Sequence, residues 1–237
     1  MPLDHLLARL AEAPDRAALF LDVDGTLAPI VPRPENARVP EATRAELRRL
    51  VRRYALVACV SGRPGPVAEQ IVGVDGIVYV GEHGLDLEPE AEAWVERLRE
   101  FVATVDWPAE DKRLTVSFHW RSADDPGAAR AELEGVAERA RAAGLVALFG
   151  RKVLEVRPPL DTHKGTAVGR LLAERSLARA LYAGDDRTDL DAFAGLEGLE
   201  LAVRVVVASD EAPPELRAAA DVVVASPEEL VELLRVL

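Results

Sequence analysis

A short apolar stretch near the N-terminus ends in two carboxylates, and it constrains the fold more than any other feature. Residues 19–27 read LFLDVDGTL, so Asp22 and Asp24 follow the apolar run and Gly25 breaks it. Such a run is typical of a buried strand, and ligands of α/β proteins bind at the carboxyl ends of strands. Two carboxylates there repel each other unless a cation shares the site. The motif therefore predicts a divalent metal beside a nucleophilic carboxylate, although a plain Asp-Gly turn is the alternative.

Strand-like and helix-like segments alternate along most of the chain. The expected strands are 18–23, 55–60, 77–80, 178–183, 201–207 and 221–224. The expected helices are 41–53, 64–72, 164–175, 189–195, 214–220 and 227–237. Such alternation predicts βα units on a parallel sheet, that is, a Rossmann-like α/β core.

The middle of the chain has a different pattern. Its expected strands are 85–88, 113–120, 145–149 and 152–156, and its expected helices are 91–104 and 126–143. The last two strands are separated by Gly150 and Arg151, which suggests a hairpin. This pattern favours a small antiparallel sheet with helices on one face. We therefore expect an α+β domain, residues 84–160, inserted into a core domain formed by residues 1–83 and 161–237.

Composition narrows the possible partners. The 237 residues carry a formal net charge of -12, which argues against nucleic acid or an anionic membrane surface as a partner. The N-terminal residues lack the apolar region of a signal peptide, and no apolar stretch approaches the ~20 residues that span a bilayer. The single cysteine, Cys59, excludes an intramolecular disulfide and a cysteine-based zinc site. We expect a cytoplasmic monomer that binds a small molecule.

Two further segments carry groups that suit a phosphate. The second expected strand ends in Ser61, Gly62 and Arg63. A hydroxyl and free backbone N–H groups at such a strand end are typical of phosphate binding, but also of an ordinary turn. Lys164 opens a later helix, where the helix dipole disfavours a cation. A bound anion nearby would offset that penalty.

A second acidic cluster follows the strand expected at 178–183. Gly184 is followed by Asp185 and Asp186, and Asp189 comes one turn later. The dipole of the following helix accounts for two of these acids. It does not account for the Gly-Asp-Asp at the strand end, which again indicates a cation.

These four motifs, in this order, resemble the haloacid dehalogenase (HAD) superfamily of phosphotransferases. The resemblance implies that Asp22 is the nucleophile that becomes an aspartyl-phosphate. Asp24 would protonate the leaving alcohol and then activate water. A Mg²⁺ ion would be held by Asp22, Asp185 and the backbone carbonyl of Asp24. The other residues implied in the core are Lys164 on the phosphoryl group, Ser61, Gly62 and Arg63 on the substrate, and Asp186 and Asp189 near the metal, where they would orient water or Lys164.

Segments 81–84, 110–112, 117–121 and 150–158 resemble the cap of trehalose-6-phosphate phosphatases. The resemblance implies that Glu110, Lys112, Lys152 and Glu155 hydrogen-bond sugar hydroxyls. It also implies substrate contacts from His83, His119 and Arg121. Three positions depart from the family pattern. Trp120 stands where tyrosine is usual, His163 stands where aspartate or asparagine is usual, and Leu190 stands where glutamate is common.

The resemblance therefore implies a Mg²⁺-dependent phosphatase that converts trehalose 6-phosphate to trehalose and phosphate. Three alternatives stay open. One is a related sugar phosphatase that acts on sucrose 6-phosphate or mannosyl-3-phosphoglycerate. Another is a sugar-phosphate sensor without turnover, and the third is a phosphomutase.

Overall fold

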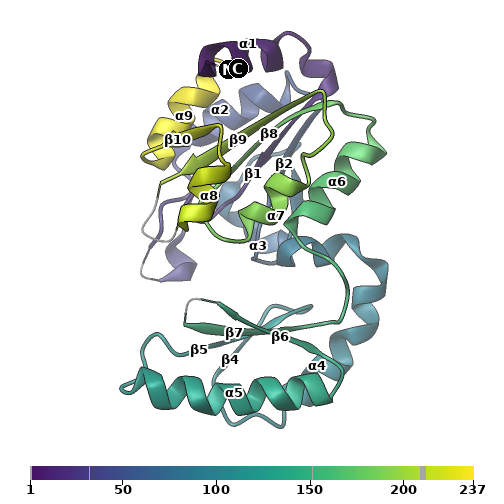
Figure 1. The fold of residues 1–237 in the computed structure, drawn as a ribbon, viewed down its shortest axis with the longest axis vertical. Coiled ribbons are helices and arrows are strands. Elements are labelled where there is room, and N and C mark those ends of the chain that lie inside the picture. The colour runs from purple at the N-terminus through teal and green to yellow at the C-terminus, as the bar shows by residue number, and fades with distance from the viewer. Residues whose placement is uncertain (1, 32, 151, 209–211) are drawn as a thin grey trace. The chain divides into compact units, whose positions relative to one another are not determined.

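The chain folds into two compact units, shown in Figure 1. The computed structural model describes residues 2–31, 33–150, 152–208 and 212–237. The core unit comprises Met1–Gly84 and Thr162–Leu237, and the inserted unit comprises Leu85–Asp161. One unit contains a parallel sheet and the other an antiparallel sheet, so the expected fold class is confirmed.

The sheet of the core unit has six strands in the order β10-β9-β8-β1-β2-β3, and all neighbours are parallel. The strands are β1 (Ala17–Leu21), β2 (Leu56–Val60), β3 (Val78–Val80), β8 (Arg179–Gly184), β9 (Leu201–Val207) and β10 (Val222–Val224). The chain proceeds from β1 toward β3 on one side and from β8 toward β10 on the other. The carboxyl ends of β1, β2 and β8 are therefore adjacent at a topological switch point, where ligands bind in such sheets.

Helices cover both faces of this sheet (Figure 1). One face carries α1 (Leu3–Ala11), α2 (Glu41–Val51), α3 (Gly65–Val72) and α9 (Pro227–Arg235). The other carries α6 (Lys164–Glu174), α7 (Asp189–Ala194) and α8 (Pro214–Ala219). Two short 3-10 helices, η1 (Pro14–Arg16) and η2 (Pro34–Asn36), lie in the connecting loops. Among the helices that the structure describes, none is both long enough and apolar enough to cross a bilayer.

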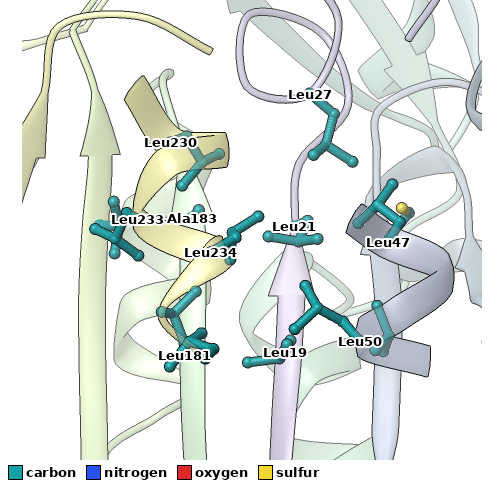
Figure 2. Close-up of a cluster of buried hydrophobic side chains, with 14 of the residues drawn as sticks. Leu19, Leu21, Leu27, Leu47, Leu50, Leu181, Ala183, Leu230, Leu233 and Leu234 are labelled. Atoms are coloured by element: carbon teal, nitrogen blue, oxygen red, sulfur yellow. The ribbon is translucent and has the colours of Figure 1, made fainter. Parts of the chain in front are cut away.

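Strand β1 alternates its side chains between the two faces of the sheet. Leu19 and Leu21 belong to a cluster of buried hydrophobic side chains in the core unit, which Figure 2 shows between helices α2 and α9. The other cluster members labelled on those helices are Leu47, Leu50, Leu230, Leu233 and Leu234. Each leucine buried in this way contributes roughly 1.5–3 kcal/mol. Phe20 lies on the opposite face, and Asp22 continues the alternation toward the side of α6 and α7.

The inserted unit has a four-stranded antiparallel sheet in the order β4-β5-β7-β6. Its strands are β4 (Ala109–Asp111), β5 (Val116–His119), β6 (Val146–Gly150) and β7 (Val153–Arg157). Its helices are α4 (Val95–Val102) and α5 (Pro126–Ala142), preceded by the 3-10 helices η3 (Glu82–Leu87) and η4 (Pro89–Trp94). Leu98 and Phe101 of α4 and Leu133 of α5 share one cluster with Phe118 and Leu154 of the sheet. Both helices therefore cover the same face.

Three local expectations differ from the structure. The strand expected at 85–88 is wrong, because the chain turns in η3, where Glu82, His83 and Gly84 all have positive φ angles. The helix expected at 91–104 is shorter, because its first turns belong to η4. Strand β4 was not expected because its three residues are exposed and show no apolar alternation. The expected turn residue Arg151 lies outside the described residues.

Candidate active site

Two carboxylates stand at the ends of neighbouring strands in the core unit. Asp22 follows β1 and Asp185 follows β8, and they are 5% and 2% exposed. One oxygen of each lies within 4.8 Å of the other and of an oxygen of Asp189. Three carboxylates at this separation in a buried site repel one another strongly unless positive charge is shared among them.

Lys164 supplies one positive charge to this cluster. It is the first residue of α6, and its Nζ donates hydrogen bonds of 2.8 Å to Asp22 Oδ1 and 2.8 Å to Asp189 Oδ1. Burial lowers the pKa of Lys164, but the carboxylates of Asp189 and Asp22 outweigh burial and hold it well above its ordinary value. Lys164 is therefore charged at neutral pH, and the carboxylates offset the unfavourable helix dipole.

The unusual residue before Lys164 has a clear local role. His163 is the N-cap of α6, and its Nδ1 accepts a hydrogen bond of 3.1 Å from the backbone N–H of Gly165. Its own backbone N–H donates to Thr166 Oγ1 at 3.0 Å, which completes a capping box. Histidine thus performs the capping function of an aspartate or asparagine, and it fixes the start of α6 from which Lys164 projects.

All the acceptor sites of the Asp189 carboxylate are used by hydrogen bonds, so none is left to bind a metal. Its Oδ1 accepts from Lys164 Nζ and from Tyr182 Oη, the latter at 2.7 Å. Its Oδ2 accepts from the backbone N–H groups of Asp185 at 2.8 Å and Asp186 at 2.9 Å. Since a carboxylate offers about four acceptor sites, Asp189 is saturated. Its geometry suits holding Lys164 in place, and leaves Asp22 and Asp185 to a cation.

Tyr182 is the residue of this group that sequence reasoning missed. It lies in the apolar strand β8, is fully buried, and packs edge-on against Phe193 with ring centroids 5.9 Å apart. A buried tyrosine hydroxyl needs a hydrogen-bond partner, and here the partner is Asp189. The signal in the sequence was a tyrosine amid aliphatic residues, two positions before Gly184.

Burial raises the pKa of Asp22 well above its ordinary value, although Lys164 opposes this change. Asp189 and Asp185 raise it further by repulsion. A protonated Asp22 is a poor nucleophile, so a further positive charge is needed for an ionised carboxylate at this position. Asp22 and Asp185 bring carboxylate oxygens within 4.8 Å of each other, and carboxylate oxygens are ligands of the kind that Mg²⁺ prefers. The residues present therefore fit a divalent ion.

Gly25 and Asp186 lie next to Asp185. Gly25 has φ +80°, and a Cβ atom there would overlap the Asp185 carboxylate. Asp186 accepts hydrogen bonds from the backbone N–H and the hydroxyl of Thr188, at 2.8 and 2.5 Å. Burial raises the pKa of Asp186, but Lys164 and the bonds from Thr188 outweigh burial and lower it overall. Asp186 therefore stays ionised beside the site.

The loop after β2 brings Ser61 to the same edge of the sheet. Ser61 is 1% exposed, and its Oγ accepts a hydrogen bond of 3.2 Å from the backbone N–H of Arg63. Its carbonyl accepts from His83 N at 3.0 Å, and the Arg63 carbonyl accepts from Glu82 N at 2.9 Å. A Cβ atom on Gly62 would lie 2.7 Å from the His83 ring. His83 therefore packs directly against this loop.

Arg63 binds Asp24. Its Nε and Nη2 donate to Asp24 Oδ2 and Oδ1 at 2.6 and 2.7 Å, and its Nη1 donates to the Pro34 carbonyl at 3.1 Å. The sequence placed Arg63 among substrate ligands, whereas here its guanidinium is engaged by a carboxylate of the same unit.

Polar residues of the inserted unit gather on the face of its sheet opposite helices α4 and α5. Glu110 of β4 is paired in register with Ser117 of β5, and Ser117 with Glu155 of β7. Neighbouring Phe118 and Leu154 point the other way, into the apolar cluster. His119, two residues beyond Ser117 and on the same face, has its Nε2 2.7 Å from Glu110 Oε2.

Three other expected residues lie at the ends of these strands. Lys112 follows β4, and its backbone N–H donates a hydrogen bond of 3.0 Å to the Thr115 carbonyl. Lys152 precedes β7 with φ 58°, and its carbonyl accepts from Trp120 N at 3.1 Å. Arg121 follows β5 and is exposed. Trp120 itself is buried against Phe149, so in this chain it belongs to the core of the inserted unit.

Comparisons with known sequences identify the family. The family model for trehalose-phosphatase matches residues 20–109 and 108–227. A trehalose-phosphate phosphatase of Mycobacterium avium is 37% identical over 207 residues, covering 76% of this chain and 51% of that protein. Probable trehalose-phosphate phosphatase 4 of Oryza sativa subsp. japonica is 31% identical over 208 residues, covering 75% and 55%. The chain thus spans about half the length of these curated relatives.

Solved structures share the fold. A trehalose-6-phosphate phosphatase related protein matches with a TM-score of 0.70 and 26% identity, covering 92% of this chain and 95% of that one. The C-terminal domain of C. albicans trehalose-6-phosphate phosphatase matches with a TM-score of 0.73 and 22% identity, covering 98% and 94%. Because the family model matches well over half of its residues, this chain belongs to the trehalose-phosphatase family.

Proposed function

We propose that this chain is a Mg²⁺-dependent phosphatase that hydrolyses trehalose 6-phosphate to trehalose and inorganic phosphate. The observation that carries the proposal is the buried contact between Lys164 Nζ and Asp22 Oδ1, beside the carboxylate of Asp185. Phosphoryl transfer needs a positioned nucleophile and neutralised charge more than further covalent chemistry. A sensor without turnover needs no such nucleophile. The names of the family and of the curated relatives support this substrate.

In the first half of the reaction, a carboxylate oxygen of Asp22 attacks the phosphorus atom. The bond from phosphorus to the sugar oxygen breaks, and Asp24 donates a proton to that oxygen, so that the sugar leaves as a neutral alcohol. Lys164 and Ser61 bind the oxygens of the phosphoryl group during transfer. When bound by Asp22, Asp185 and the Asp24 carbonyl, Mg²⁺ would neutralise charge on the phosphoryl group.

In the second half, water attacks the phosphorus of the aspartyl-phosphate. Asp24, now ionised, takes a proton from that water, and the Asp22 carboxylate leaves. Asp189 and Tyr182 hold Lys164 in place through both halves. The reaction thus returns each side chain to its starting state and releases phosphate.

The face of the inserted sheet opposite α4 and α5 supplies the sugar specificity. Glu110, Lys112, Lys152 and Glu155 offer matched donors and acceptors to sugar hydroxyls, which are costly to bury unpaired. We add Ser117 to this group, because it lies in register between Glu110 and Glu155. Its buried Oγ has no hydrogen-bond partner within the described part of the chain. His83, His119 and Arg121 stay predicted substrate contacts, and a cytoplasmic location and a monomeric state also stay predictions.

Phosphate release tests the proposal. Trehalose 6-phosphate, glucose 6-phosphate and sucrose 6-phosphate are compared with Mg²⁺ and with EDTA, and Asp22→Asn serves as the inactive control. We expect metal-dependent release that strongly prefers trehalose 6-phosphate. A different preference would overturn the substrate assignment but keep the mechanism. No release from any ester would favour the sensor or the phosphomutase.

A further inference from the structure

The side chains of Arg63 and Asp24 form a direct contact in the core unit, and further hydrogen bonds hold Arg63 in place. The two hydrogen bonds of 2.6 and 2.7 Å form a bidentate pair, the strongest geometry for arginine and carboxylate. The Arg63 side chain is 19% exposed and that of Asp24 is 38% exposed. Arg63 is also tied to the Pro34 carbonyl, and its backbone is bonded to Ser61 and Glu82. The Arg63 guanidinium is therefore held by hydrogen bonds to two other residues, whereas a typical surface ion pair is mobile.

Asp24 depends on Arg63 for its orientation. Within the described residues, no other side chain hydrogen-bonds its carboxylate. The carboxylate offers about four acceptor sites, and the bidentate pair uses one on each oxygen. Each oxygen therefore retains a site that can exchange a proton with a substrate oxygen or with water. Removal of Arg63 would take away the two hydrogen bonds that fix the plane of the Asp24 carboxylate.

We propose that Arg63 is a positioning residue that acts on the reaction through Asp24 and not by binding the substrate. This inference rests on the proposed function, in which Asp24 protonates the leaving oxygen and then accepts a proton from water. Arg63 fixes the plane of the carboxylate for both proton transfers. Lysine cannot replace it, because an ammonium group cannot make the planar bidentate contact.

A direct role of Arg63 on the phosphate makes a different prediction. An arginine that binds the phosphoryl group contributes to every phosphate ester, whatever its leaving group. An arginine that positions the general acid matters only where the leaving oxygen needs a proton. A sugar alkoxide needs one, whereas nitrophenolate is stable enough to leave without it. The leaving group therefore distinguishes the two roles.

The experiment compares kcat/KM for trehalose 6-phosphate and nitrophenyl phosphate, since kcat/KM includes steps only up to departure of the leaving group. The variants are Arg63→Gln, Arg63→Lys and, as a matched control, Arg170→Gln, whose side chain forms an exposed pair with Glu174 at 2.9 Å in the same unit. We expect both Arg63 variants to lose about 10²-fold on the sugar phosphate, the cost of a misplaced catalytic group. The loss on nitrophenyl phosphate should be at least tenfold smaller.

Equal losses of kcat/KM on the two esters would overturn the inference and assign Arg63 to the phosphate. Full activity of Arg63→Lys on both esters would also overturn it. Unfolding midpoints of each variant in urea separate a folding defect from a catalytic one, because a folding defect lowers both activities together. Wild-type protein that hydrolyses neither ester would overturn the proposed function as well. If wild type hydrolyses another sugar phosphate instead, that ester replaces trehalose 6-phosphate and the positioning test is unchanged.

Discussion

Lys164 Nζ lies 2.8 Å from Asp22 Oδ1, although the two residues are 142 positions apart in the chain. The same ammonium group bonds Asp189 at 2.8 Å, so one cation joins the end of β1 to the starts of α6 and α7. This buried contact ties the stability of the core unit to its chemistry. A change at any of the three residues affects both.

Replacement of Lys164 by methionine should abolish turnover and destabilise the core unit by about 3–5 kcal/mol, because two buried carboxylates lose their cation. Urea unfolding in EDTA measures the free energy of unfolding, and phosphate release measures turnover. Arg170→Gln breaks an exposed ion pair with Glu174, and loss of such a pair should cost under about 1 kcal/mol. Similar losses from the two variants would contradict the buried network.

Replacement of Tyr182 by phenylalanine removes one of the four hydrogen bonds to Asp189. We expect a loss of about 1.5–3 kcal/mol in the free energy of unfolding, which is typical of a bond to a charged group. Turnover should also fall, because Asp189 then holds Lys164 less firmly. Tyr79→Phe is the control, since Tyr79 Oη donates at 2.8 Å to the Val74 carbonyl, away from the acidic cluster. An equal fall of turnover in both variants would argue against a role for Tyr182.

Mg²⁺ should stabilise the folded protein through Asp185. At a concentration of 100 times its Kd, a ligand that binds only the native state adds about 2.7 kcal/mol to the free energy of unfolding. Thermal unfolding at rising Mg²⁺ concentration should therefore show an increasing Tm in the wild type, and little change in Asp185→Asn. Asp191→Asn removes an exposed acid of α7 and should respond as the wild type does. A response retained by Asp185→Asn would place the ion elsewhere.

Alkaline pH should destabilise the protein through Cys59. Burial raises the pKa of this thiol above its ordinary value, and the nearby Asp22 charge raises it further. Above pH 9 the unfolded chain loses the thiol proton while the folded chain keeps it, so unfolding releases a proton. The free energy of unfolding therefore falls as pH rises. Urea unfolding across this range should give a shallower fall in Cys59→Ala. A thiol reagent that labels the folded wild type readily at pH 8 would contradict this burial.

The architecture and most members of the candidate site could be predicted from the sequence alone. Apolar runs alternating with amphipathic segments imply a parallel sheet, and residues directly after parallel strands must meet at one edge. Asp22, Ser61 and Asp185 could therefore be predicted as neighbours without coordinates. Lys164 was identifiable because a lysine at a helix start is unfavourable without a nearby anion.

The pairing of these side chains, in contrast, depends on the assembled fold. That Arg63 binds Asp24, and that Tyr182 completes the bonds of Asp189, depends on rotamers and loop paths that no local pattern specifies. The turn at Glu82 and His83 could not be predicted from the sequence for a similar reason. Positive φ angles at non-glycine residues have no favourable intrinsic propensity, and they persist only where surrounding packing and hydrogen bonds hold them. Periodicity reports which face of an element is buried, whereas the contacts made across that face arise only when all the elements are assembled.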